Sequence, residues 1–206
     1  MRDLPNLLSM GRLLTTIPLV VLVLLNHPWA YLAAAGLFAL GAVSDWFDGQ
    51  LARRYKVVSN LGVFLDLAAD KVYVSALLVA LVQVAVVPAW LVVVIVSREF
   101  IVAGLRSLAA SEGVVIPAGR WGKQKTVVTM VGLGGLLLAK GLGSSATFPW
   151  GAASSAGLAF SINNGAGYLL VASDVVMLLA VMWTIFSAIE YLAGGWPLLK
   201  RRAPRG

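Results

Sequence analysis

Long apolar runs separated by short polar turns make up most of this chain. A helix needs about 20 apolar residues to cross a bilayer, and six runs are predicted as helices that do so. Their predicted bounds are 13–26, Tyr31–Tyr55, Leu61–Val82, Trp90–Ala110, Trp121–Leu142 and Tyr168–Leu192. Residues 143–167 are rich in Gly, Ser and Ala and are predicted to form the one long loop.

The two ends of the chain are predicted to lie outside these spans. Residues 3–10 are too short to cross a bilayer and favour a small interfacial helix. Residues 197–206 form a basic tail, and residues 1–206 are predicted as a single membrane-embedded domain. A signal peptide is an alternative for the first run, but the next helix begins directly after the turn at 26–28, which argues against cleavage.

Composition supports a membrane protein. The 206 residues are 60% hydrophobic and 12% charged, with a mean hydropathy of +0.89. A soluble domain of this size carries about twice that charged fraction. The predicted fold class is therefore an all-α polytopic integral membrane protein with six transmembrane helices. The absence of cysteine excludes disulfides and thiolate metal sites.

The net charge of +7 is concentrated beside the predicted spans. Six spans put both termini on one face, and nearly all bases fall on that face. They are Arg2, Arg12, Arg53, Arg54, Lys56, Arg106, Arg120, Lys123, Lys125, Lys200, Arg201, Arg202 and Arg205. Lys140 alone lies near the opposite face. Since basic flanks face the cytoplasm, this face is predicted to be cytoplasmic. Anionic lipid or phosphate explains these bases better than nucleic acid does.

Four of the nine acidic residues lie between positions 45 and 70, inside or beside apolar segments. On helices, Asp45 and Asp48 share one face, and so do Asp66 and Asp70. A helical hairpin would bring both pairs to the same depth, about 15 Å from its turn. Four converging carboxylates repel one another unless cations neutralise them, so a site for two divalent cations is predicted. A buried ion-pair network around Arg53, Arg54 and Lys71 is the alternative.

Small residues follow the carboxylates on one helix face. Asp45, Gly49 and Ala52 are spaced i, i+4 and i+7. A flat nucleotide could lie against this bare backbone, although small residues also permit close packing between membrane helices. Because four aspartates lie beside these small residues, we favour a nucleotide-binding surface over helix packing.

The spacing D-x2-D-G-x2-A-R-x8-G-x3-D-x3-D resembles the signature of the CDP-alcohol phosphotransferases at every position. The resemblance implies two divalent cations, Mg2+ or Mn2+, held by Asp45, Asp48 and Asp66, with Asp70 as general base and further possible ligand. It also implies a site for a CDP-linked lipid. The residues implied for that site are Asp45, Gly49, Ala52, Arg53 and Gly62.

A second group of bases lies near the cytoplasmic ends of the fourth and fifth predicted spans. It comprises Arg98, Arg106, Arg120, Lys123 and Lys125. Five bases are more than a neutral alcohol needs, and they favour an acceptor that carries its own phosphate. Membrane orientation alone is the alternative, above all for Lys123 and Lys125. Arg98 and Glu99 lie inside an apolar segment, where charges are functional candidates by default.

Residues 4 to about 130 resemble the bacterial phosphatidylglycerophosphate synthases more narrowly, through Ser97–Val102, Glu112–Ile116 and Gly119–Thr126. The resemblance implies transfer of a phosphatidyl group from CDP-diacylglycerol to glycerol 3-phosphate, in a homodimer of the bacterial inner (cell) membrane. Leu67 and Arg120 depart from the usual proline and lysine, and neither change removes a ligand.

Other functions remain open from the sequence. A phosphatidylinositol phosphate or cardiolipin synthase of the same family is the nearest alternative. A cation or proton transporter would need polar groups through the whole bilayer depth, whereas Asp174 is the main polar residue in the outer halves of the spans. Asp174 is interpreted as a packing or dimer-contact residue. His27, the only histidine, is predicted to be solvated in its turn.

Overall fold

Six helices form the structure, a computed structural model that describes residues 4–55, 60–111, 113, 120–144 and 165–200. Of these it describes only the backbone at 4–9, 45–55, 60–67, 120–121, 123 and 194–200. The helices are α1 (Leu4–Leu24), α2 (Pro28–Tyr55), α3 (Asn60–Gln83), α4 (Ala89–Ser111), α5 (Arg120–Gly141) and α6 (Gly165–Lys200). The described residues contain no strand, which confirms the predicted all-α class for that part of the chain.

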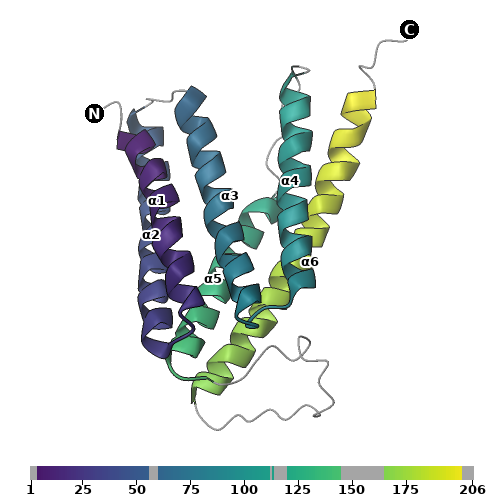
Figure 1. Cartoon of the computed structure of the whole chain (residues 1–206). Helices are drawn as coiled ribbons and strands as arrows, with labels where there is room; N and C mark the ends of the chain where they lie inside the picture. Colours follow the sequence, from purple (N-terminus) through teal and green to yellow (C-terminus); the bar gives the residue numbers. More distant parts are fainter. Residues whose placement is uncertain (1–3, 56–59, 112, 114–119, 145–164, 201–206) are drawn as a thin grey trace.

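Successive helices run in opposite directions. The start of α1 and the end of α6 therefore lie at the same end of the bundle, at the top of Figure 1. The end of α2 and the start of α3 lie there too, and we call this end of the bundle the motif end. Helix α6 packs against α4 and α5, α1 packs against α2 and α3, α2 also packs against α5, and α3 packs against α4. Among the described residues, α5 has no Cα atom within 8 Å of α3 or of α4, so only side chains bridge from α5 to these two helices.

Two predicted boundaries are wrong. Residues 4–24 form one continuous helix, not an interfacial helix followed by a separate span. The polar residues in this segment do not interrupt it, because the Thr15 and Thr16 hydroxyls donate to the Arg12 carbonyl at 2.9 and 3.0 Å within the helix. Helix α6 also runs past its predicted end at Leu192 to Lys200, and so takes in the start of the predicted basic tail.

The turn between α1 and α2 follows directly from its sequence. Asn26 has a φ of 49°, a left-handed conformation that asparagine tolerates and that ends a helix. Pro28 then occupies the first position of α2, where its missing N–H costs no hydrogen bond. The Tyr31 hydroxyl donates to Asn26 Oδ1 at 2.8 Å and fixes the turn to α2.

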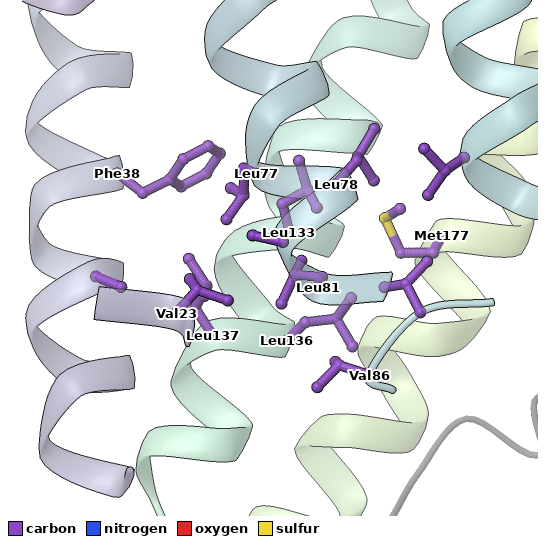
Figure 2. Close-up of a cluster of buried hydrophobic side chains, with 14 of the residues drawn as sticks. Val23, Phe38, Leu77, Leu78, Leu81, Val86, Leu133, Leu136, Leu137 and Met177 are labelled. Atoms are coloured by element: carbon purple, nitrogen blue, oxygen red, sulfur yellow. The ribbon is translucent and has the colours of Figure 1, made fainter. Parts of the chain in front are cut away.

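A leucine-rich core holds the bundle together below the motif end. Figure 2 shows a part of it, in which side chains from different helices meet. Its labelled members are Val23 of α1, Phe38 of α2, Leu77, Leu78 and Leu81 of α3, Leu133, Leu136 and Leu137 of α5, Met177 of α6, and Val86 from the turn after α3. Since Leu77, Leu78, Leu81, Leu133, Leu136, Leu137 and Met177 are fully buried, this core fixes the positions of the helices that carry the polar site.

Tyr73 sets the register of α2 against α3. Its ring stacks on Phe38 with centroids 5.9 Å apart, and its hydroxyl donates to the Leu37 carbonyl at 3.3 Å. Gly41 lies against the same hydroxyl, and a Cβ at this position would be 2.7 Å from it. A glycine is needed here because the tyrosine ring occupies the space of a side chain.

We expect Gly41→Ala to destabilise the protein by about 1–3 kcal/mol, the usual cost of overpacking a buried contact. The Tyr73 ring is held by its stack and its hydrogen bond, so α2 and α3 must separate to admit the methyl group. Thermal unfolding of the purified protein in detergent measures the effect.

Gly36→Ala is the matched control for this prediction. Gly36 lies on the same helix, and nothing lies within 4 Å of a Cβ built there. Gly36→Ala should leave stability unchanged or raise it slightly through helix propensity. Tyr73→Phe in the Gly41→Ala background removes the clashing oxygen and should recover part of the loss. Equal stability of Gly41→Ala and Gly36→Ala would contradict the register contact.

One helix segment among the described residues is long and apolar enough to cross a membrane by length and composition. It is Gly165–Ala193 of α6, with 29 residues and a mean hydropathy of 2.3. Shorter apolar stretches cover Met10–Leu24 and Pro28–Ser44.

Candidate active site

The register at Tyr73 aligns the four acidic positions of the motif. From Gly41, one helical turn toward the motif end reaches Asp45 on α2, while three residues from Tyr73 in the same direction reach Asp70 on α3. These steps rise about 6 and 4.5 Å along antiparallel helices. Asp48 and Asp66 each lie seven residues from the same two reference positions, a rise of about 10 Å. Counted from this contact, Asp45 and Asp70 lie at similar depths, and so do Asp48 and Asp66, although no Cα atoms of α2 and α3 lie within 8 Å of each other among the described residues.

The structure describes the side chain of only one of these four aspartates. Asp70 is half-buried, whereas the side chains of Asp45, Asp48 and Asp66 lie outside the described residues. Among the side chains that are described, no group of three or more His, Cys, Asp or Glu residues could hold a metal ion. The four-aspartate cation site remains a prediction, and the matched depths fit it, since carboxylate oxygens are the ligands that Mg2+ prefers.

The predicted nucleotide-binding positions lie on the same two helices. Gly49, Ala52 and Arg53 belong to the last part of α2, and Gly62 belongs to the first turn of α3. Their side chains too are outside the described residues, so the nucleotide-binding surface of small residues beside Asp45 stays a prediction.

A small pocket opens beside Asp70, in the space between α3, α4 and α5. Its volume is about 40 Å³. Polar and charged groups line one part of it and core side chains such as Leu78 and Ile95 line another. Its polar lining consists of Asp70, Lys71 and Ser75 of α3, Glu99 of α4, and Lys125, Thr126 and Thr129 of α5. The pocket thus combines a motif aspartate with two lysines.

Glu99 joins the charged groups of this pocket. Its Oε2 accepts from Lys71 Nζ at 3.3 Å, and its Oε1 accepts from Arg98 at 3.1 Å. Lys125 Nζ also forms an ion pair with Oε1. One carboxylate therefore ties together cations from α3, α4 and α5. Lys71 of the alternative ion-pair network is paired with Glu99, whereas the side chains of Arg53 and Arg54 lie outside the described residues.

Arg98 is buried beside this cluster and is turned toward α6. Its guanidinium donates to the Ser187 hydroxyl and lies over the Tyr191 ring, 5.6 Å from the centroid. It does not line the pocket itself. The sequence did not indicate these contacts, because α6 carries no motif. The one available signal was that Ser187 and Tyr191 are spaced i, i+4 and so share a face of an apolar helix.

The other predicted acceptor-binding bases differ in position. Arg106 is exposed and lies seven residues beyond Glu99, on the same face of α4 and about 10 Å nearer the motif end. Arg120 and Lys123 belong to the first turn of α5, and their side chains are outside the described residues. Lys125 is the buried base of this helix. The structure thus brings Lys125 and Arg98 to the pocket region, with Arg106 above it.

Asp174 lies deep in α6, away from this site. It is only 4% exposed, and neither of its carboxylate oxygens has a hydrogen-bond partner among the residues that the structure describes. This burial in the chain's own bundle fits the packing half of the interpretation as a packing or dimer-contact residue. His27 is exposed in its turn beside Trp29, in agreement with the prediction of a solvated side chain.

A family model and several relatives that match this chain all carry names of phosphatidyltransferases or of a phosphatidylglycerophosphate synthase. The family model for CDP-alcohol phosphatidyltransferase matches residues 2–187. A CDP-diacylglycerol–glycerol-3-phosphate 3-phosphatidyltransferase of Bacillus subtilis (strain 168) is 35% identical, over 97% of this chain and 98% of that protein. A Pseudomonas fluorescens protein of the same name is 34% identical, over 96% and 92%. A probable phosphatidylglycerophosphate synthase of Mycobacterium tuberculosis (strain CDC 1551 / Oshkosh) is 32% identical, over 93% and 80%.

Proposed function

The chain belongs to the CDP-alcohol phosphatidyltransferase family, and on this premise we propose that it transfers the phosphatidyl group of CDP-diacylglycerol to glycerol 3-phosphate. The products are phosphatidylglycerophosphate and CMP. Relatives that carry the name of this activity align with nearly the whole chain. The chain is therefore a phosphatidyltransferase of phospholipid biosynthesis, and its two substrates are those that the relatives' names imply.

One observation carries the proposal beyond the names. A single pocket is lined by Asp70, the predicted general base, and by Lys71 and Lys125, which suit a phosphate. A base and a phosphate site must lie side by side if the substrate is an alcohol that carries a phosphate. Thr126 and Thr129 add hydroxyl groups to the same wall.

The chemistry assigned to these residues is a substitution at phosphorus. The acceptor hydroxyl loses its proton to the Asp70 carboxylate and attacks the lipid-side phosphorus of CDP-diacylglycerol. An oxygen–phosphorus bond to the acceptor forms, the pyrophosphate bond breaks, and CMP leaves. Arg53 is assigned to the nucleotide or its phosphates, and Gly49, Ala52 and Gly62 to the surface that the nucleotide covers.

Divalent cations belong to this assignment, because the family is generally dependent on them. Asp45, Asp48, Asp66 and Asp70 would hold two Mg2+ or Mn2+ ions. These ions would neutralise the bridging phosphates and the leaving CMP. The support from this chain is the matched depth of the four positions on α2 and α3.

We also propose that all six helices cross the membrane, with the motif end in the cytoplasm. Large apolar side chains are exposed on every helix, among them Leu14, Leu40, Val79, Phe100, Val127 and Phe186. A soluble monomer rarely exposes so much apolar surface, whereas a bilayer covers it. The basic residues near the motif end fit a cytoplasmic face. The homodimer remains a prediction from the resemblance.

We expect glycerol 3-phosphate to be used far better than serine, inositol or phosphatidylglycerol. Charge-assisted bonds to phosphate contribute roughly 1.5–3 kcal/mol each, and a neutral acceptor forms none of them. The purified protein is incubated with CDP-diacylglycerol, Mg2+ and one radiolabelled acceptor at a time, and the extracted lipid is counted.

Inositol 3-phosphate is the informative competitor in this panel, because it carries the same phosphate on a bulkier ring. Incorporation of inositol phosphate without glycerol 3-phosphate would assign the chain to the rival synthase. Incorporation of no acceptor, with an intact protein that binds CDP-diacylglycerol, would contradict the proposed function.

A further inference from the structure

Glu99 is a negative residue in a pocket assigned to a negative substrate. It lies in the middle of α4, its side chain is 21% exposed, and no step of the proposed reaction uses it. Its two oxygens bind Lys71, Arg98 and Lys125. On its own, this carboxylate would repel a negatively charged acceptor. Its ion pairs with the three cations therefore suggest that it acts by holding them in place.

The three cations depend on Glu99 to different degrees. Arg98 has anchors on α6, at Ser187 and Tyr191, in addition to Glu99. The ammonium groups of Lys71 and Lys125 have no such second anchor: within the described part of the chain, the Glu99 carboxylate is the only group with which either Nζ atom forms an ion pair or a hydrogen bond. The two lysines therefore meet because Glu99 lies between them.

The backbone does not hold these lysines together. Lys71 is on α3 and Lys125 is on α5, and across the described residues α5 has no Cα atom within 8 Å of α4, the helix that carries Glu99. The Lys125 side chain is 10% exposed and that of Lys71 is 19% exposed, so water screens their mutual repulsion only in part. Asp70 also lines this pocket, but among the described side chains Glu99 is the carboxylate whose oxygens contact both ammonium groups.

The charges of the cluster suit a phosphate monoester. Three cations against the carboxylates of Glu99 and the neighbouring Asp70 leave a net charge of +1, which attracts a phosphate monoester, whose charge is about −2 at neutral pH. Removing the carboxylate gives a higher formal charge but disperses the cations that carry it. Two lysines preorganised at one wall of the pocket bind an anion better than two lysines that must first be brought together.

We propose that Glu99 is a positioning residue for the acceptor: its carboxylate holds Lys71 and Lys125 at the pocket wall, where they bind the phosphate of the acceptor alcohol. This inference rests on the proposed function for the identity of the acceptor. It assigns Glu99 no contact with the CDP-lipid and no part in proton transfer.

The test is a comparison of Glu99→Gln with wild-type protein in the transfer assay. We expect KM for glycerol 3-phosphate to rise about ten- to a hundredfold, the effect of losing one charge-assisted interaction. KM for CDP-diacylglycerol and kcat at saturating acceptor should stay near their wild-type values. Glu190→Gln, the same substitution at an exposed position of α6, is the matched control and should leave all three unchanged.

A double variant separates positioning from general damage. If Glu99 acts through Lys125, then Glu99→Gln should change KM much less in a Lys125→Met background than in wild type. A lower KM for glycerol 3-phosphate in Glu99→Gln would mean that the carboxylate competes with the phosphate, and would overturn the proposal. An equal rise in both KM values would overturn it too.

Two further measurements test the inference if the Glu99→Gln protein is not stable or if the acceptor is a different one. If Glu99→Gln does not accumulate in membranes, Glu99→Asp takes its place, and only KM for glycerol 3-phosphate should rise. If the wild-type protein uses a different acceptor, the proposed function fails, and inorganic phosphate becomes the probe. Phosphate should then raise the unfolding temperature of wild type and Glu190→Gln at concentrations about tenfold below those that Glu99→Gln needs. Equal phosphate titrations for all three proteins would overturn the inference.

Discussion

Removal of divalent cations should abolish phosphatidyl transfer by the purified protein, and added Mg2+ or Mn2+ should restore it. The four acidic positions of α2 and α3 lie at similar depths by helical rise, and four carboxylates brought together there would need a counter-charge. The nearby cations Lys71, Arg98 and Lys125 are already paired with Glu99. A metal-dependent step that contributes several kcal/mol corresponds to a loss of at least about 10³-fold. Dialysis against EDTA, followed by the transfer assay with and without excess Mg2+, measures it.

A control must show that the loss of activity in EDTA is not caused by unfolding of the protein. The unfolding temperature in EDTA should fall only moderately, because the leucine core and the Tyr73 contact between α2 and α3 do not involve the aspartates. Asp45→Asn should raise the Mg2+ concentration required for half-maximal activity. Full turnover in EDTA by a protein free of bound metal would contradict the cation site and would favour an ion-pair network instead.

The number and type of helices could be predicted from the sequence because apolar runs of membrane length are a local signal. The predicted helix break near Arg12 was wrong because a charged residue is a weak indicator of where a helix ends. The helix α1 continues through this region without interruption. Helix ends depend on such details more than helix existence does.

The similar depth of the four aspartate positions agrees with their spacing on either side of the predicted hairpin, whereas the convergence of their side chains on cations stays a prediction. The Glu99 cluster was only half predicted. Arg98 and Glu99 stood out as charges in an apolar run, but their partners on α3, α5 and α6 follow from tertiary packing. Arg98 and Ser187 are 89 positions apart in the chain, and no local pattern joins them.

The second large effect is expected at Asp70. Asp70→Asn should lower kcat by roughly 10²- to 10⁴-fold, the usual contribution of a general base. Asparagine has nearly the same shape but cannot accept the hydroxyl proton of the acceptor. The half-buried position of Asp70 in the pocket with Lys71 and Lys125 puts it next to the site assigned to that acceptor. Initial rates at saturating concentrations of both substrates and of Mg2+ give the change in kcat.

Binding measurements then separate a base from a metal ligand. Asp70→Asn should still bind CDP-diacylglycerol at a wild-type concentration of Mg2+, whereas Asp45→Asn should need far more Mg2+ to bind it. This difference follows because Asp45 is assigned to the cations and the nucleotide, while Asp70 is also assigned to the proton of the acceptor. If excess Mg2+ restored full turnover to Asp70→Asn, its loss would be one of metal affinity alone. In that case a group other than Asp70 would accept the proton of the acceptor hydroxyl. Asp70 would be a metal ligand beside the pocket lysines and would not be the general base.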